Sequence, residues 1–335
     1  MSIACKIDDR FLLNFNMDKN KPYISFIVTG RNDDYGHRFL YRIQRFTDNL
    51  VYLCEKCELP AELIFVEWNP PKDKERLYQA LKVKKERKFI KIRFMEVSKE
   101  IHDKVKTSDR MPLLEFPGKN AGIRRAKGEF IVITNPDIIF SEKMIKFFSK
   151  KQLKKDIFYR ADRCDLFVDI PTELKTEDIE KFCKDNWNFC WSPTFGRYHR
   201  GTKLISDIPR LFIRTGAKMT KGRAYLRYHG GAPGDFTLLS KESWINFRGF
   251  PEINVHGGMD GYTSIMAVAS GNKLKTLKER TYHQSHGNPT AGERPLPNVD
   301  DYIRDAKKML KEKKAMIFND DNWGLRDFSL KETEL

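Results

Sequence analysis

Apolar runs alternate with amphipathic stretches along the N-terminal part of the chain. Continuous apolar and β-branched runs occupy 22–29, 62–67, 89–97 and 129–134. Each run ends at polar or turn-forming residues, which is typical of strands buried on both faces of a sheet. Between the first three runs, apolar residues at helical spacing predict helices at about 35–56 and 73–85. This βαβαβ order predicts an α/β fold whose mainly parallel sheet carries helices on both faces.

The periodic pattern is weaker in the second half of the chain. A short helix is predicted at 141–148, and the segment from about 150 to 234 is rich in turns. Capped helices are predicted at 240–247 and 260–269, because a glycine follows each of them. The stretch 300–317 has apolar residues on one side and lysines on the other, which predicts an amphipathic C-terminal helix before a polar tail.

The composition of the 335 residues is that of a globular protein, with 40% apolar and 12% aromatic residues. The N-terminal segment carries charges where a signal peptide needs its apolar run, and no stretch reaches the roughly 18 apolar residues of a spanning helix. We therefore expect a cytoplasmic protein. The six cysteines are scattered, which predicts reduced thiols, and Cys54 and Cys57 lack a second pair at zinc spacing.

The formal net charge of +16 predicts attraction to anions such as nucleotide phosphates, nucleic acid and anionic membrane headgroups. Lysine runs at 82–91, 150–155 and 307–314 are most simply solvated faces. A nucleic-acid-binding protein is one hypothesis, although the sequence lacks the zinc-finger, RNA-recognition and helix-turn-helix patterns that direct such charges. We therefore expect weak peripheral contact with anionic membrane and no specific nucleic acid.

Aromatic residues cluster in one part of the turn-rich segment. They are Trp187, Phe189, Trp191, Phe195 and Tyr198. Rings at this density are typical of a hydrophobic core, and beside Arg197 and Arg200 they also suit a sugar acceptor.

The segment 119–137 combines features of a diphosphate site. It contains Arg124 and Arg125, runs into the strand 129–134 and ends in Asn135-Pro136-Asp137. A helix N-terminus, two arginines and a strand-end carboxylate together suit a metal diphosphate. The same residues also fit a basic helix before a strand whose terminal aspartate opens a turn.

This segment resembles the donor-binding region of GT-A fold glycosyltransferases, especially enzymes of the family 2 type. In that family an Asn-x-Gly-x-x-x-Ala-x-Gly-Glu-(Phe/Tyr) run leads into a strand that ends in Asp-x-Asp. Here the run begins at Asn120 and the metal motif ends at Asp137. The resemblance extends from about 23 to 287 and continues in three later segments. These are 234–236, 248–252 and 259–261.

The resemblance implies a GT-A-like, Rossmann-type catalytic domain at 1–295, followed by a C-terminal helix and tail at 296–335. Within this domain, 22–137 would bind the nucleotide sugar and 138–295 would form the acceptor-side half. The implied activity is metal-dependent, inverting transfer of a sugar, with UDP-sugars favoured, to a hydroxyl of a glycan or lipid-linked acceptor. A nucleotidyltransferase stays open as an alternative, because such enzymes share the nucleotide-binding order of strands and helices.

The resemblance also assigns residues to the donor. Arg31 and Asn32 match the loop after the first strand, which lines the nucleotide. Glu67 matches the carboxylate that contacts base or ribose, while Asn120 and Arg124 match the donor-side helix. On the residues alone, Glu67 is equally a surface charge at the end of a strand.

Asp137 matches the last residue of the family's metal motif, which implies bound Mn²⁺ or Mg²⁺. Asn135 replaces the first aspartate of that motif, so either another ligand contributes or the metal affinity is lower. The family often supplies a late histidine, and His283 and His286 are the candidates. Only one of them need be a ligand, and a structural role in a loop is the alternative for both.

Asp260 matches the family's acidic position near the acceptor, which implies that it is the general base, with Asp235 as the reserve candidate. An aspartate before Gly261 and Tyr262 is also an ordinary N-cap of a helix. The two roles are compatible, since a capping carboxylate still faces the cleft.

Overall fold

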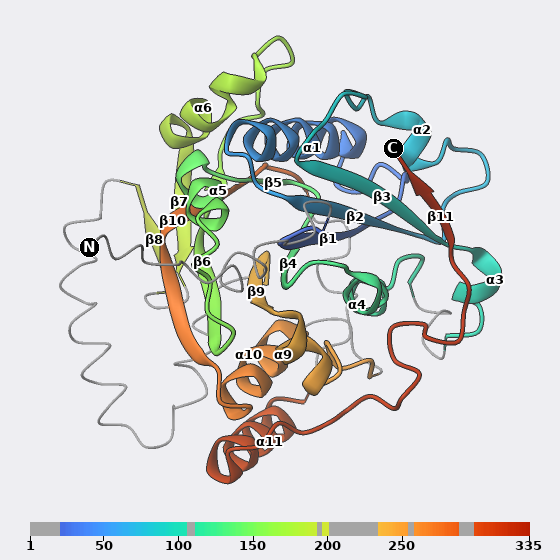
Figure 1. Cartoon of the computed structure of the whole chain (residues 1–335), viewed down its shortest axis with the longest axis vertical. Coiled ribbons are helices and arrows are strands. Elements are labelled where there is room, and N and C mark those ends of the chain that lie inside the picture. Colours follow the sequence, from blue (N-terminus) through green and yellow to red (C-terminus); the bar gives the residue numbers. More distant parts are fainter. Residues whose placement is uncertain (1–20, 106–110, 193–195, 201–233, 254–257, 288–297) are drawn as a thin grey trace, which may run out of the picture.

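The computed structural model describes residues 21–105, 111–192, 196–200, 234–253, 258–287 and 298–335. Their strands form one sheet in the order β11-β3-β2-β1-β4-β9-β6-β10-β5, with the hairpin of β7 and β8 attached to β6 (Figure 1). Predictions that fall on 1–20, on Phe195 or on 201–233 lie outside the described residues.

The parallel part of the sheet confirms the fold predicted from the apolar runs. Its strands are β1 (Ile24–Gly30), β2 (Ala61–Trp68), β3 (Ile90–Val97) and β4 (Phe130–Thr134). They pair in parallel in the order β3-β2-β1-β4. All residues of β1, β2 and β4 are buried, which explains why these strands have no polar alternation.

Helices cover both faces of this parallel part. On one face, α1 (Phe39–Lys56) packs Ile43, Phe46 and Leu50 into a core that includes Phe26 of β1. On the other face, α4 (Glu115–Arg125) belongs to a second core that includes Ile27 of the same strand. Figure 1 shows α1 and α4 on opposite sides of the sheet. The prediction of helices on both faces is confirmed.

The rest of the sheet is mixed and was mostly missed by the sequence analysis. It contains β5 (Ile138–Ile139), β6 (Ile157–Leu166), β7 (Trp187–Ser192), β8 (Gly196–His199), β9 (Phe236–Ser240) and β10 (Lys273–His283). β9 runs antiparallel to β4 and β6, whereas β6 and β10 are parallel. β10 is only partly buried along most of its length, so its charged residues gave no apolar run.

The remaining helices lie at predicted positions, except that those at 99–102 and 179–185 were not predicted and one is shorter than predicted. They are α2 (Leu77–Ala80), α3 (Lys99–His102), α5 (Glu142–Ser149), α6 (Ile179–Asp185), α9 (Lys241–Asn246), α10 (Met259–Ala269) and α11 (Val299–Glu312). The helix predicted at 73–85 is wrong in extent, because only the single turn of α2 forms there. Gly249 and Gly271, which follow α9 and α10, both have positive φ values, as the predicted helix ends require.

The tail after α11 is part of the fold. It crosses α4, where Arg125 donates to the carbonyl oxygens of Gly324, Leu325 and Phe328. It then forms β11 (Lys331–Glu334), which pairs antiparallel with the edge strand β3 (Figure 1). Arg93 of β3 binds Glu332 of β11 on one side and buried Glu62 of β2 on the other.

The aromatic cluster lies on the hairpin of β7 and β8. Trp187 and Tyr198 are buried in a third core with Tyr282 of β10, as a core role predicts. Phe189 and Trp191 are half-buried. Among the described residues, no helix combines the length and the apolar character needed to span a membrane.

Candidate functional site

A cavity of about 460 Å³ opens at the carboxyl ends of β1 and β4. Parallel sheets of this kind bind ligands at that edge. Its walls come from the ends of β1, β4 and β10, from β6, and from the first turns of α4 and α10. Polar residues in these walls include Arg31, Lys119, Asn135, Asp137, Arg163, Asp235, Asp260, His283 and His286.

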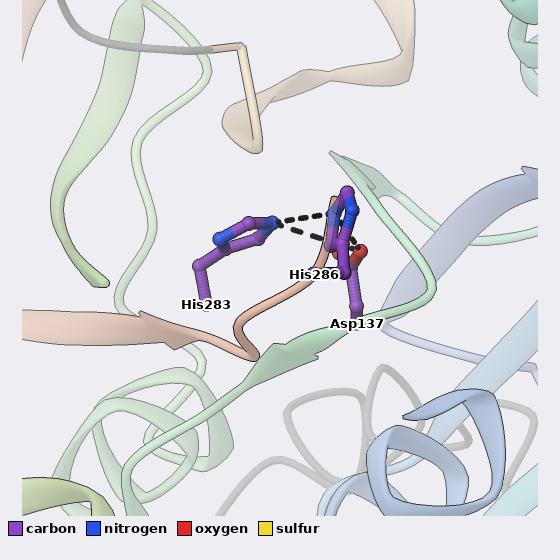
Figure 2. Close-up of side chains that lie close together, drawn as sticks. All are labelled: Asp137, His283 and His286. Atoms are coloured by element: carbon purple, nitrogen blue, oxygen red, sulfur yellow. Dashed lines mark hydrogen bonds and ion pairs between the residues drawn. The ribbon is translucent and has the colours of Figure 1, made fainter. Parts of the chain in front are cut away.

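Three side chains meet at one wall of the cavity (Figure 2). Asp137 follows β4, His283 ends β10, and His286 lies three residues further along. The Nε2 atoms of His283 and His286 lie 3.6 Å and 3.2 Å from Asp137 Oδ2, and 3.2 Å from each other. One ligand atom from each residue lies within 4.8 Å of the others, so the group could hold a metal ion.

The other ring nitrogen of each histidine has its own acceptor. His283 Nδ1 lies 2.6 Å from Asp165 Oδ1, and His286 Nδ1 lies 2.6 Å from the carbonyl oxygen of Gly287. When both Nδ1 atoms donate to these oxygens, both Nε2 atoms present lone pairs toward Asp137. Two lone pairs and a carboxylate at such short distances need a cation between them, either protons or a metal.

The charges of the three side chains influence one another. Burial alone would raise the pKa of Asp137, but the charges and hydrogen bonds of His283 and His286 hold it well below its usual range. Burial lowers the pKa of His283, yet Asp137 and Asp165 outweigh this and raise it to about 9. Asp137 Oδ1 is buried and makes no hydrogen bond in the described structure. This free oxygen and the two imidazoles fit a divalent metal.

Asn135 does not point into the histidine cluster. Its Nδ2 donates to Asp235 Oδ1 at 2.6 Å, and its Oδ1 accepts from Lys119 Nζ at 2.9 Å. Lys119 is 2% exposed and also binds Glu115 Oε1 at 2.6 Å. Burial lowers the pKa of Lys119, but Glu115 and Asp260 outweigh it and raise the pKa, so the amine stays charged. Asn135 therefore joins a cation and an anion, which an aspartate could not do.

The two candidate bases differ in how their carboxylates are engaged. Asp235 accepts from Asn135 on one oxygen and from Arg163 on the other. Asp260 lies in the first turn of α10, where burial is the main cause that raises its pKa to about 6. Its Oδ1 makes no hydrogen bond in the described structure. The N-cap alternative for Asp260 is wrong, because Gly258 is the N-cap of α10.

Not all of the residues assigned to the donor line the cavity. Arg31 lines the cavity, while its guanidinium binds Asp33 and the carbonyl oxygen of Asn69. Asn32 is buried and donates to the carbonyl oxygen of Glu75. Of the five residues that the resemblance assigns to the donor, only Arg31 lines the cavity, together with Asn135 of the metal motif.

The other three donor candidates make contacts within the protein. Glu67 is buried rather than exposed, accepts from the backbone N–H of Leu77, and has its pKa raised to about 7 by burial. Asn120 binds the backbone of Phe250 and the carboxylate of Glu252. Arg124 donates to carbonyl oxygens of Asp321 and Trp323 in the tail.

Sequence reasoning missed Arg163, Asp165 and Lys119. Arg163 and Asp165 lie in β6, inside the segment that was predicted to be rich in turns. Alternation along this strand was the signal that could have found them, since residues two apart point to the same face. Lys119 directly precedes Asn120, the first residue of the motif that carried the resemblance.

No family model matches the chain, and no curated protein is significantly similar to it. Among solved structures, the crystal structure of S. aureus TarS matches at 12% identity with a TM-score of 0.40, over 78% of this chain and 36% of that chain. TarS 1–349 in complex with UDP matches at 11% and 0.40, over 87% of this chain and 64% of that one. The complex with UDP-GlcNAc gives 10% and 0.41, with coverages of 87% and 66%. The chain thus spans less than two thirds of each TarS chain, and the similarity is too low to assign a reaction.

Proposed function

We propose that this protein is a metal-dependent glycosyltransferase, which transfers a sugar from a nucleotide diphosphate donor, with UDP-sugars favoured, to a hydroxyl of a glycan or lipid-linked acceptor. One observation carries the proposal. Asp137, His283 and His286 converge at the carboxyl edge of a parallel sheet, in the wall of a cavity that also contains Arg31 and Asp260. The sequence resemblance to GT-A enzymes supports the same assignment.

The set of metal ligands favours Mn²⁺ over Mg²⁺, because Mg²⁺ prefers oxygen ligands and two of the three ligands are imidazoles. Asp137, His283 and His286 would hold the metal, which when bound supplies positive charge for the leaving diphosphate. Arg31 also lines the cavity and adds a cation to its wall. Such fixed charges stabilise the negative charge that develops as the glycosidic bond breaks.

Asp260 is the proposed general base. The acceptor oxygen forms a bond to the anomeric carbon, the bond from that carbon to the diphosphate oxygen breaks, and its electron pair leaves with the diphosphate. The acceptor proton passes to Asp260, whose Oδ1 has no hydrogen bond in the described structure. Attack from the face opposite the diphosphate inverts the anomeric centre. Asp235 is the weaker candidate, because both of its oxygens are engaged.

The first experiment tests donor and metal together. Purified protein is mixed with Mn²⁺ and a panel of UDP-, GDP- and CMP-sugars that includes UDP-GlcNAc, and the thermal midpoint and the slow release of free nucleotide are followed. A matching donor raises the midpoint, because a bound ligand stabilises the folded state by mass action. Asp137→Ala is expected to lose this shift, while the exposed control Asp156→Ala keeps it.

Two results would contradict the proposed function. Synthesis of a nucleotide sugar from a nucleoside triphosphate and a sugar 1-phosphate, with release of pyrophosphate, would indicate a nucleotidyltransferase. An unchanged Mn²⁺-dependent shift in Asp137→Ala would remove the metal site on which the proposal depends.

A further inference from the structure

We propose that Asp165 is a positioning residue for the metal centre: it fixes the tautomer and orientation of His283 so that Nε2 is the ligand atom. This role rests on the proposed metal site, and no sequence motif includes Asp165. Asp165 itself is not a ligand in this proposal.

The pairing of two strands places Asp165 against His283. β6 and β10 run parallel, and their register sets Asp165 directly opposite His283. Asp165 is buried, and its Oδ1 lies 2.6 Å from His283 Nδ1. A slip of one residue in this register would turn the carboxylate to the other face of the sheet. The contact is therefore a consequence of the fold and not of a flexible side chain.

A second set of contacts holds the carboxylate in place. Arg163, two residues earlier on the same face of β6, binds Asp165 through Nη2 at 3.0 Å. The same guanidinium donates through Nη1 to Asp235, which in turn accepts from Asn135. A continuous chain of hydrogen-bonded side chains thus runs from Asn135, two residues before Asp137, to Nδ1 of His283. Buried, fully paired carboxylates of this kind hold one geometry.

The chemical consequence follows from the two nitrogens of imidazole. A neutral ring that donates Nδ1–H to a carboxylate has its lone pair on Nε2, and the negative partner makes that nitrogen a stronger ligand. His286 reaches the same tautomer through the carbonyl oxygen of Gly287. The two histidines therefore use different acceptors, and only the acceptor of His283 is a side chain that a substitution can remove.

The test compares Mn²⁺ binding in variants, measured from the electron paramagnetic resonance signal of free Mn²⁺. Asp165→Ala is expected to weaken Mn²⁺ binding roughly 10- to 100-fold, the usual effect of losing such a partner. Asp165→Asn keeps an acceptor oxygen and is expected to lose much less. Asp156→Ala, an exposed aspartate just before the same strand, is the matched control and is expected to bind as the wild type does.

A second measurement needs no variant and so does not depend on whether Asp165→Ala folds. Long-range ¹H–¹⁵N NMR on histidine-labelled wild type, loaded with diamagnetic Cd²⁺, reports which nitrogen carries the proton. The expected pattern for His283 is protonated Nδ1 and metal-bound Nε2.

The outcomes separate this inference from the proposed function. Equal Mn²⁺ affinity in wild type and folded Asp165→Ala, or a Nε2-protonated His283, would overturn the role of Asp165 and leave the glycosyltransferase proposal standing. A wild type that binds no Mn²⁺ would instead overturn the metal-dependent function itself.

Discussion

The two edges of the parallel sheet carry charge in opposite ways. At the carboxyl edge, the anions and cations of the cavity contact one another, from Lys119 through Asn135 and Asp235 to Arg163. At the amino edge, a second cavity of about 1010 Å³ is lined by seven lysines and only two glutamates. The lysines are Lys21, Lys88, Lys91, Lys127, Lys151, Lys155 and Lys241.

The lysines of the amino edge are mostly unpaired. Lys155 lies 3.8 Å from Glu129, and Lys241 donates to the carbonyl oxygen of Ala126. The other five have no ion pair with any described residue. Paired charges fix geometry, as bond rearrangement requires, whereas unpaired exposed charges attract anions without fixing them. The comparison therefore predicts large, specific effects at the carboxyl edge and small, salt-dependent effects at the amino edge.

The largest effect is expected at Asp260. Asp260→Asn keeps the shape of the side chain and removes the proposed base, so turnover should fall about 10²- to 10⁴-fold with donor binding nearly unchanged. Steady-state kinetics and donor titration measure the two quantities, and Asp156→Asn is the control. Product NMR checks the stereochemistry: a retained anomeric configuration would end this mechanism.

A smaller effect is expected for Glu67, which lies at the end of β2. Its pKa of about 7 is higher in the folded protein than in the unfolded chain, so folding favours the protonated form. The wild type therefore loses stability as the pH rises from about 4.5 through about 7. Glu67→Gln cannot titrate, so its free energy of unfolding relative to wild type should improve by about 2 to 3 kcal/mol between pH 5 and pH 8. A pH-independent difference would show that Glu67 is not held in this way.

Asn135→Asp tests whether the departure from the Asp-x-Asp motif of GT-A enzymes weakens Mn²⁺ binding. The new carboxylate would face Asp235 across a 2.6 Å contact with no hydrogen to donate. We expect about 2 kcal/mol of destabilisation and no gain in Mn²⁺ affinity. The swap Asn135→Asp with Asp235→Asn restores one donor and one acceptor, and should recover most of the stability. Tighter Mn²⁺ binding in the single variant would show instead that Asn135 is a weakened ligand.

The smallest effect is expected at the amino edge. Replacing Lys88 and Lys91 by Gln should weaken binding to phosphatidylglycerol vesicles roughly tenfold at low salt, and the difference should fade as salt increases. Replacing Lys307 and Lys308 of α11 by Gln gives the same change in net charge outside this cavity, and should weaken vesicle binding less. Equal losses would show that only net charge matters. Tight binding of one DNA or RNA sequence at high salt would contradict the expected absence of specific nucleic acid.

The parts of this fold that the sequence predicts are those with both faces buried. β1, β2 and β4 have every residue buried, so their apolar runs are visible without any knowledge of neighbours. β6 is mostly buried but carries charged residues, β10 is partly exposed, and their place in the sheet depends on pairing with each other. Local pattern alone does not encode such long-range pairing.

The same limit applies to the site. Asp137 was identified from a motif, and His283 and His286 from their order along the chain, yet only the sheet brings the three together. Arg124 shows the opposite case. Its position in the motif suggests that it binds phosphate, but its guanidinium donates hydrogen bonds to carbonyl oxygens of the tail. Asp165 has no motif, because its role arises from the register of β6 against β10.

The pairing of β11 with β3 has a consequence for the order in which the protein is made. β3 is synthesised early, and its outer edge exposes unpaired backbone groups that can bind other chains. The residues that cover this edge, Lys331–Glu334, lie far along the chain from β3 and are therefore synthesised much later. The same late segment neutralises Arg93, which pairs with Glu332. During translation the outer edge of β3 therefore stays unpaired until β11 is made. A nascent chain that stalls before β11 exposes this edge to pairing with other chains.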